Sequence, residues 1–286
     1  MPLVALGLVL TSAFLHAIWN AIVKAGDDRL VAAWATTAAG AILGLGLLGI
    51  AGLPSRYALA FALPSGVLHA AYVVALARAY DAGDLSLVYP IARGVAPVLA
   101  TAGAVVAFHE TLPWAAYGGI GLVTVGVLLL SALGHRADAS VAREPVRQAI
   151  AWSLLTSACI AGYTLIDRQG VRQTSALSYV AVLFLIHSSL LALYVRAERR
   201  TFPWRLLVPA QMWTFGLSGA LALGAYLLVL VALSISQVGY IAALRETSVL
   251  VAAWIGWRHL GDLQGLPRLV SSGVVALGLA ILVASR

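Results

Sequence analysis

Charged residues are scarce in this sequence of 286 residues. Asp, Glu, Lys and Arg make up 10% of it, whereas soluble domains contain about 25%. Hydrophobic residues make up 62%, and the mean hydropathy is +0.95. Too few polar residues remain to cover a water-exposed surface, and apolar stretches of roughly twenty residues recur along the chain. The composition excludes a soluble protein and predicts a multi-pass protein of the inner or plasma membrane.

Residues and motifs that bind metals, nucleotides or nucleic acids are equally sparse. Cys159 is the single cysteine and lies in an apolar run, so there is no disulfide framework and no thiolate cluster. A phosphate-binding loop for ATP, an HExxH motif and paired central carboxylates are absent from the sequence. The net charge is +7, but the basic residues lie at span ends and in short loops. We therefore predict no cofactor, no metal, no nucleic-acid partner and no enzymatic activity.

The long apolar stretches predict transmembrane helices. A backbone in lipid must satisfy its own hydrogen bonds, and no stretch alternates as a barrel strand does, so each is interpreted as a helix. A polar connecting loop at 134–146 separates two groups of five spans. The predicted fold is an all-α membrane protein with ten transmembrane helices, arranged as two inverted five-helix repeats, residues 1–133 and 147–286. The spans lie at about 3–25, 30–53, 64–82, 85–108 and 113–133, and at about 147–168, 176–196, 211–233, 236–258 and 267–285.

The two halves resemble each other in sequence. Arg93 and Arg245 are separated by the same interval as Glu110 and Asp262, so YPIARGVAPVLATAGAVVAFHE aligns without gaps with IAALRETSVLVAAWIGWRHLGD. Apolar residues align with any apolar segment, but a shared arginine and a shared terminal acid at one interval are harder to dismiss. An odd number of spans per half makes the second half enter the membrane from the opposite side, which predicts the inverted symmetry typical of alternating access.

Ionisable residues near the centre of a predicted span are rare. Glu246 is the one acid there, and the other acids fall in loops or near span ends. A charge at the bilayer centre costs about 2.5 to 3.5 kcal/mol on insertion scales, so Glu246, Arg245 and Arg93 each need a partner or an internal cavity. Neighbouring helix residues point about 100° apart, so Arg245 and Glu246 need separate partners, and Arg93 is the predicted partner of Glu246. This group either serves substrate recognition or ion coupling, or only locks spans four and nine together.

Other polar side chains are predicted to shape the same cavity. His16 and Asn20 are four residues apart and share a helix face, which Trp19 nearly joins. His187, in contrast, is more typical of a hydrogen-bonded core histidine than of a proton relay. The predicted substrate-binding set comprises Arg93, Arg245, Glu246, Tyr89, Trp19, Asn20, His16, Tyr72, Tyr226 and Tyr240.

Two further patterns concern helix shape and packing. Pro90 and Pro97 lie on either side of Gly94 in the fourth span and remove two backbone donors, so we expect this span to be the bent one. The bend would serve as a hinge, as an opened binding backbone or only as a static kink. Small residues predict close helix packing, with Gly40 and Gly44 in the second span and Ala220 and Gly224 in the eighth.

Three segments combine these features: HAIWNAIVK at 16–24, LVYPIARGVAPVL at 87–99 followed by Glu110, and GYIAALRETSVL at 239–250. Together they resemble the drug/metabolite transporter superfamily, in particular its EamA type, over nearly the whole chain. The resemblance implies two five-helix repeats around a central cavity and a secondary carrier, often an exporter of amino acids or related metabolites. This chain has Gly261 and Asp262 where the family often has Gly-Glu. The HAIWN opening is similar to a branch found beside phosphonate-use genes, and two buried arginines would suit an anion.

The count of basic residues and the family resemblance place the termini on opposite sides of the membrane. With ten spans, four basic residues lie on the side of the termini and twelve on the other side, which places the termini outside by the positive-inside rule. The resemblance implies cytoplasmic termini instead. Substrate, direction, coupling ion and oligomeric state also stay open.

The leading functional hypothesis is a gradient-driven transporter of a small polar metabolite, with amino-acid-like or anionic compounds such as phosphonates as candidates for export. Its expected partners are the metabolite, H+ as a candidate coupling ion, and the lipid bilayer. A lipid-directed flippase or intramembrane enzyme is the second hypothesis, and it would need a groove open to lipid and a reactive cluster. A non-transporting assembly subunit is the third, suggested only by the Gly-rich packing faces.

Overall fold

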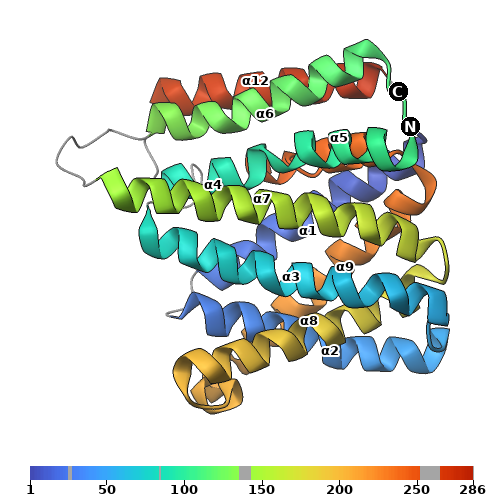
Figure 1. The fold of residues 1–286 in the computed structure, drawn as a ribbon, viewed down its shortest axis with the longest axis vertical. Coiled ribbons are helices and arrows are strands. Elements are labelled where there is room, and N and C mark those ends of the chain that lie inside the picture. Colours follow the sequence, from blue (N-terminus) through green and yellow to red (C-terminus); the bar gives the residue numbers. More distant parts are fainter. Residues whose placement is uncertain (25–27, 84, 135–142, 252–264, 286) are drawn as a thin grey trace.

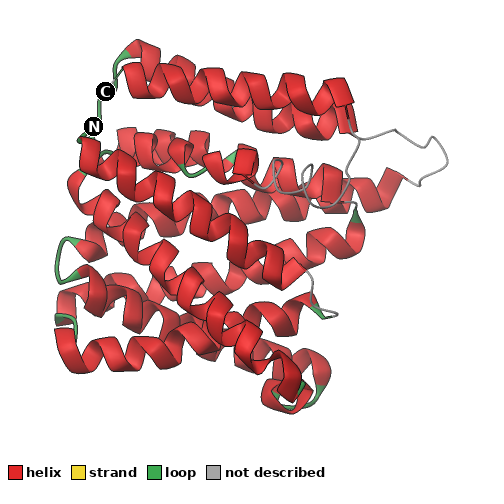
Figure 2. Ribbon diagram, turned by 180° about the vertical axis from the view of Figure 1, so that it is seen from behind, coloured by secondary structure: helices red, strands yellow, loops and turns green. Residues whose placement is uncertain are grey.

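The structure, a computed structural model, describes residues 1–24, 28–83, 85–134, 143–251 and 265–285, and all regular elements in these ranges are helices (Figure 2). Seven of them are long and apolar enough to cross a membrane, and Trp114–Leu129 and Val270–Ala284 are shorter apolar helices. The chain is therefore a multi-pass helical membrane protein. The helices are α1 (Leu3–Lys24), α2 (Arg29–Ala51), α3 (Arg56–Ala82), α4 (Leu85–Gly94), α5 (Ala96–Phe108), α6 (Trp114–Gly134), α7 (Arg143–Val171), α8 (Ala176–Arg199), α9 (Met212–Ile235), α10 (Val238–Leu244) and α12 (Gly265–Ala284), with the short 3-10 helices η1 (Pro203–Leu206) and η2 (Pro209–Gln211) before α9.

The predicted spans overlap these helices but differ from them at several ends. α3 begins at Arg56, well before the predicted start at Pro64, because the Ser55 hydroxyl caps the helix by accepting a hydrogen bond from the backbone N–H of Ala58 at 3.1 Å. α7 begins at Arg143, so the predicted connecting loop at 134–146 was too long. The end of the predicted ninth span, at 252–258, and Asp262 lie outside the described residues.

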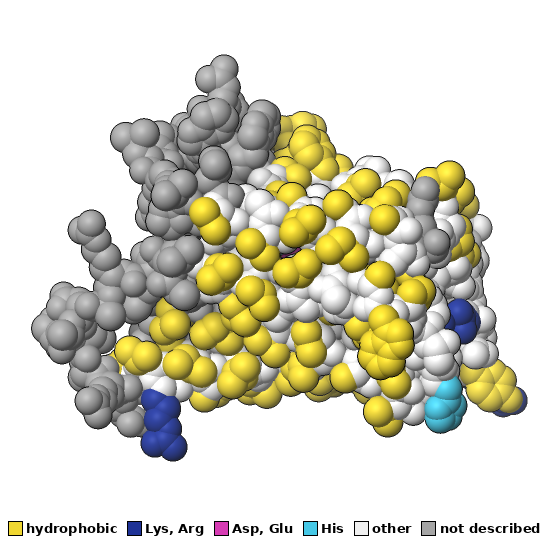
Figure 3. Space-filling view, turned by 90° about the horizontal axis from the view of Figure 1, so that it is seen from above, with side chains coloured by type: hydrophobic (Ala, Val, Ile, Leu, Met, Phe, Trp, Pro, Cys, Tyr) yellow, Lys and Arg dark blue, Asp and Glu magenta, His cyan; other side chains and the backbone are white. Residues whose placement is uncertain are grey.

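The long helices run roughly parallel across one bundle, and both termini lie at the same end of it (Figure 1). α6 packs against α12 as one outer layer, and α2 packs against α8 at the opposite edge. Between these layers, α3 packs against α7 and α1 against α9. On the face formed by α6 and α12, hydrophobic side chains cover the middle, and the visible Lys and Arg side chains lie towards the ends (Figure 3). Such a surface suits lipid in the middle and water at the ends.

Small residues let α2 and α9 approach closely. A Cβ atom at Gly219 of α9 would lie 2.7 Å from the backbone nitrogen of Gly40 in α2, too close for any side chain. Gly40 and Gly44 therefore pack as predicted, the latter against the backbone of α8. The choice of Ala220 and Gly224 was wrong, because Ala220 is exposed and Gly224 has no neighbour within 4 Å. The apolar sequence of α9 does not reveal which of its faces meets α2.

Two helices are interrupted in the middle of the bundle. α4 ends at Gly94 and α5 begins at Ala96, so the predicted bend in the fourth span is confirmed. α10 ends at Leu244, and Arg245 and Glu246 form a turn before helical structure resumes. The second break was not predicted, because no proline or glycine marks it. The two breaks carry the charged residues that were predicted to lie near span centres.

Candidate functional site

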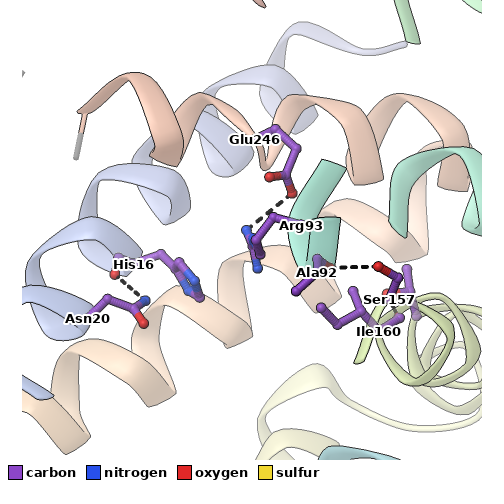
Figure 4. Close-up of polar contacts among 8 residues, drawn as sticks. His16, Asn20, Ala92, Arg93, Ser157, Ile160 and Glu246 are labelled. Atoms are coloured by element: carbon purple, nitrogen blue, oxygen red, sulfur yellow. Dashed lines mark hydrogen bonds and ion pairs between the residues drawn. The ribbon is translucent and has the colours of Figure 1, made fainter. Parts of the chain in front are cut away.

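Arg93 at the end of α4 and Glu246 at the break after α10 form an ion pair (Figure 4). Nη2 of Arg93 lies 3.2 Å from Oε1 of Glu246, and the two side chains are 11% and 5% exposed. The pairing predicted from the sequence is thus confirmed. The pair joins the two breaks, and removing either partner alone would leave an uncompensated charge in a buried place.

Arg245 is buried beside this pair, but no carboxylate lies within ion-pair distance of it among the described residues. Its guanidinium lies over the ring of Tyr226, with Cζ 5.8 Å from the ring centroid, and beside the hydroxyl of Tyr163. Nε of Arg93 and Oε2 of Glu246 also have no hydrogen-bond partner in the described part of the chain. Two cations thus face one anion, and several buried polar atoms are free to bind a further group.

A small cavity lies against these charges. Its volume is about 10 Å³, which is roughly the space that one water molecule requires. A metabolite could enter only if the surrounding helices moved apart. Ile160 and Thr164 of α7 contribute to its wall, which the sequence did not indicate because neither residue is charged. The lining residues are Arg93, Ala96, Pro97, Ala100, Ile160, Thr164, Ala242, Arg245 and Glu246.

A serine of α7 satisfies backbone carbonyl groups at the break in α4. The Ser157 hydroxyl donates to the carbonyl oxygens of Ile91 and Ala92, at 2.9 and 3.0 Å (Figure 4). A broken helix within a membrane is tolerated where side chains satisfy the freed backbone groups in this way. This contact therefore holds the backbone directly before Arg93.

The face of α1 that carries His16, Trp19 and Asn20 lies on the opposite side of the ion pair from α7 (Figure 4). The rings of His16 and Trp19 are in contact, with centroids 4.9 Å apart, and the His16 ring points towards the side of Arg93 (Figure 4). Asn20 donates its amide hydrogen to the backbone carbonyl of His16 at 2.7 Å, so part of its polarity is used within α1. Nε1 of Trp19 is buried and has no hydrogen-bond partner among the described residues. Tyr89 is half-buried one helical turn before Arg93.

The predicted tyrosines divide between two places. Tyr72 and Tyr226 join an aromatic cluster with His69, Tyr163 and His187, in which the rings of His69 and Tyr163 stack at a centroid distance of 3.8 Å. Tyr240, in contrast, donates its hydroxyl hydrogen to the carbonyl oxygen of Ser285 at 2.9 Å, at the end of α12. The structure therefore does not bring Tyr240 to the cavity.

Asp167 of α7 is a buried acid that sequence reasoning had placed near a span end. It is 0% exposed. Its Oδ1 accepts a hydrogen bond from the Tyr179 hydroxyl at 2.8 Å, and its Oδ2 accepts one from the Tyr226 hydroxyl. These partners come from α8 and α9, so no interval in the sequence reveals the network.

Glu110 and Arg168 form a second buried ion pair, at 2.6 Å, with side chains 6% and 9% exposed. Glu110 also accepts a hydrogen bond at 2.9 Å from the backbone N–H of Val238, at the start of α10. An acid at a helix N-terminus stabilises the free N–H groups there. Sequence reasoning had read both residues as span-end charges, although the matching positions of Glu110 and Asp262 hinted at a structural role.

The fold and the charged breaks define a class of molecule, a helical membrane protein with an ionic site at interrupted helices. Residues 147–284 match the model of the EamA-like transporter family. This match, which covers slightly less than half of the chain, supports an EamA-type membrane transporter. Twenty-eight chains of solved structures match this chain. One of them is a crystal structure described simply as that of a protein, and it has a TM-score of 0.75 at 15% sequence identity. The match covers 100% of this chain and 99% of the other. That likeness concerns the fold alone. A comparison with curated proteins finds no match.

Proposed function

We propose that this protein is a gradient-driven transporter of a small polar metabolite, located in the inner or plasma membrane, in which Arg93, Arg245 and Glu246 bind the solute. The observation that carries the proposal is the meeting of two buried arginines and one buried glutamate at two helix breaks that face one cavity. Charges in such a place are costly and normally serve a pathway or a partner. Interrupted helices at mid-membrane are also where secondary transporters bind their solutes.

We propose ten spans in two inverted repeats, formed by residues 1–133 and 147–286. This arrangement explains why the main contacts between helices occur in equivalent pairs. If α1, α2, α3 and α4–α5 correspond to α7, α8, α9 and α10, then the contact between α3 and α7 has its counterpart in the contact between α9 and α1. The contacts of α2 with α9 and of α8 with α3 form a second equivalent pair. The termini at one end of the bundle fit an even number of crossings. Alternating access would exchange the roles of the two halves around the cavity.

The charges favour a solute that carries an anionic group. Arg93 is occupied by Glu246, whereas Arg245 is buried without a carboxylate partner among the described residues. A carboxylate or phosphonate would neutralise Arg245 with charge-assisted hydrogen bonds. Glu246 has one carboxylate oxygen without a hydrogen bond, which could accept from an ammonium group. Amino acids and aminophosphonates carry both groups, and we propose such compounds as exported solutes.

A ligand screen tests this proposal. Purified protein is heated with L-serine, aminomethylphosphonate, succinate or putrescine, because a compound that binds the folded state raises its unfolding temperature. We expect the first two to stabilise the wild type and to have no effect on Arg245→Ala. Proteoliposomes loaded with the stabilising compound should then exchange it for external labelled compound. Stabilisation by putrescine alone, or equal stabilisation of Arg245→Ala, would contradict the proposed site.

One observation favours a second candidate, a lipid-directed protein. A groove of about 730 Å³ lies between α1, the α10 region and α12, and its wall is apolar apart from Thr247. A flippase would use such a groove for acyl chains. Transfer of a fluorescent phospholipid between leaflets by reconstituted protein, with none of the four polar compounds bound, would favour this candidate over the first.

A further inference from the structure

Asp167 has surroundings that differ from those of the other buried acids. Within the described residues, Glu246 and Glu110 each have an arginine within ion-pair distance, at 3.2 and 2.6 Å, and Asp167 has none. In this part of the chain, its hydrogen-bond partners are hydroxyl groups, those of Tyr179, Tyr226 and Ser65, and the guanidinium of Arg245 acts on it from beyond ion-pair distance. Hydroxyl groups supply hydrogen bonds but no compensating charge. A bound proton would remove the cost of this buried charge.

Two buried histidines lie near the hydroxyl groups that surround this carboxylate, since His69 contacts Ser65 and its ring lies 5.1 Å from that of Tyr226. Nδ1 of His69 donates to the carbonyl oxygen of Ser65 at 3.0 Å, and its Nε2 is buried with no hydrogen-bond partner among the described residues. Nε2 of His187 is unpartnered in the same part of the chain, and the two imidazole rings lie 5.5 Å apart. Unpaired buried nitrogens are uncommon in folded proteins and call for an explanation. Buried nitrogens of this kind are commonly satisfied by an ordered water molecule.

Tyr226 connects this carboxylate with the proposed solute site. Its hydroxyl donates to Asp167, while its ring lies under the guanidinium of Arg245. If a proton from the water phase binds the carboxylate, Asp167 becomes a hydrogen-bond donor, and the Tyr226 oxygen is then an available acceptor. Reversal of this hydrogen bond would reorient the Tyr226 hydroxyl and so alter the electrostatic surroundings of Arg245. Proton binding and solute binding are thereby linked through one side chain.

From this geometry we propose that Asp167 is the proton-binding residue that couples transport to a proton gradient, acting on the solute site through Tyr226. The coupling part rests on the proposed function, whereas proton binding itself does not. The reaction is the addition of one proton to the carboxylate and its later release to water. The titratable and charged groups around Asp167 are Tyr179 and His187 of α8, Tyr226 of α9, His69 and Tyr72 of α3, Tyr163 and Arg168 of α7, and Arg245 after α10.

Infrared titration tests the proton site without any solute. Membrane-reconstituted protein is followed by the carbonyl stretch of protonated carboxylic acids as the pH is raised. We expect a band in the wild type that disappears with rising pH and is lost in Asp167→Asn, an isosteric change. The band should persist in the matched control Glu198→Gln, which alters an acid in the exposed ion pair with Arg78. Absence of the band from the wild type, or its persistence in Asp167→Asn, would overturn the proposal.

Two further variants cover the case in which Asp167→Asn does not fold. Tyr179→Phe removes a hydroxyl donor to the carboxyl group, and Tyr226→Phe removes the hydroxyl that would accept from the protonated acid. We expect both to shift the Asp167 carbonyl band, and Tyr179→Phe to move it to higher frequency, because a carbonyl that loses a hydrogen-bond donor vibrates at higher frequency. A band unchanged in both variants would assign it to another residue and refute the site.

Transport in proteoliposomes tests the coupling separately. With aminomethylphosphonate as the probe, Asp167→Asn should retain exchange between equal pools but lose accumulation driven by a pH gradient. Accumulation at the wild-type level would refute the coupling role. If no probe is exchanged by the wild type, the proposed function fails while a positive infrared result still supports the proton site.

Discussion

Glu246 and Asp167 are both buried acids in the interior of the bundle, yet the protein stabilises them by different means. Glu246 lies 3.2 Å from the guanidinium of Arg93, and the pair joins the breaks of α4 and α10. Asp167 is held by the hydroxyls of Tyr179 and Tyr226. A guanidinium partner keeps a carboxylate ionised, whereas hydroxyl partners can serve both its ionised and its protonated form. The comparison favours an ionised carboxylate at the first place and, as proposed above, an exchangeable proton at the second.

The largest effect should follow from removing the charged partner. Arg93→Ala leaves Glu246 buried without a counter-ion, which should cost about 3 to 5 kcal/mol of unfolding free energy and abolish solute exchange. Arg245→Ala should abolish exchange with much less loss of stability, because Arg245 has no carboxylate partner among the described residues. Denaturant unfolding and exchange assays measure the two effects. Wild-type exchange in either variant would contradict the account.

The ion pair between Glu110 and Arg168 extends the comparison to a third buried acid. Because Glu110 also accepts from the N–H of Val238, Glu110→Ala should cost about 3 kcal/mol or more. The matched change Glu198→Ala, in the exposed pair with Arg78, should be close to neutral, since water already solvates both charges. Equal losses of stability in the two variants would show that burial does not determine the strength of these pairs.

The hydroxyls around Asp167 should contribute less than a guanidinium does. Tyr179→Phe and Tyr226→Phe each remove one hydrogen bond to a charged group, which should cost about 1.5 to 3 kcal/mol. Tyr57→Phe serves as the control, because its exposed hydroxyl contacts only the neighbouring Arg56 in the described structure. Thermal unfolding compares the three. If either tyrosine variant lost more unfolding free energy than Arg93→Ala, the partners of Asp167 would contribute more stability than the guanidinium partner of Glu246, contrary to the account.

The smallest effect concerns the serine that holds the break of α4. Ser157→Ala should cost about 1 kcal/mol, because it leaves carbonyl groups of Ile91 and Ala92 without this donor. Ser153→Ala, one turn earlier, removes a hydroxyl that bonds only within its own helix and should cost less. If Ser157→Ala also slows exchange, the break is part of the moving machinery. Equal stability of the two variants would exclude a special role for Ser157.

Hydropathy and charge explain what the sequence predicted well. Apolar stretches mark the helices because lipid admits few other side chains, and the cost of a buried charge led from Glu246 to Arg93. Prolines marked the break in α4, but no residue type marks the break at Arg245 and Glu246. The Asp167 network also escaped prediction, because its members come from separate helices whose relative rotation is set by packing. For the same reason, Gly224 was chosen where Gly219 makes the contact.

The central claim is that the charges at the two breaks bind the transported solute, and the most direct test is a ligand-induced shift in unfolding temperature. Aminomethylphosphonate at about a hundred times its dissociation constant should stabilise the wild type by about 2.7 kcal/mol. The account predicts that this shift disappears in Arg245→Ala, while the unliganded variant stays folded. A shift of the same size in the variant would contradict it.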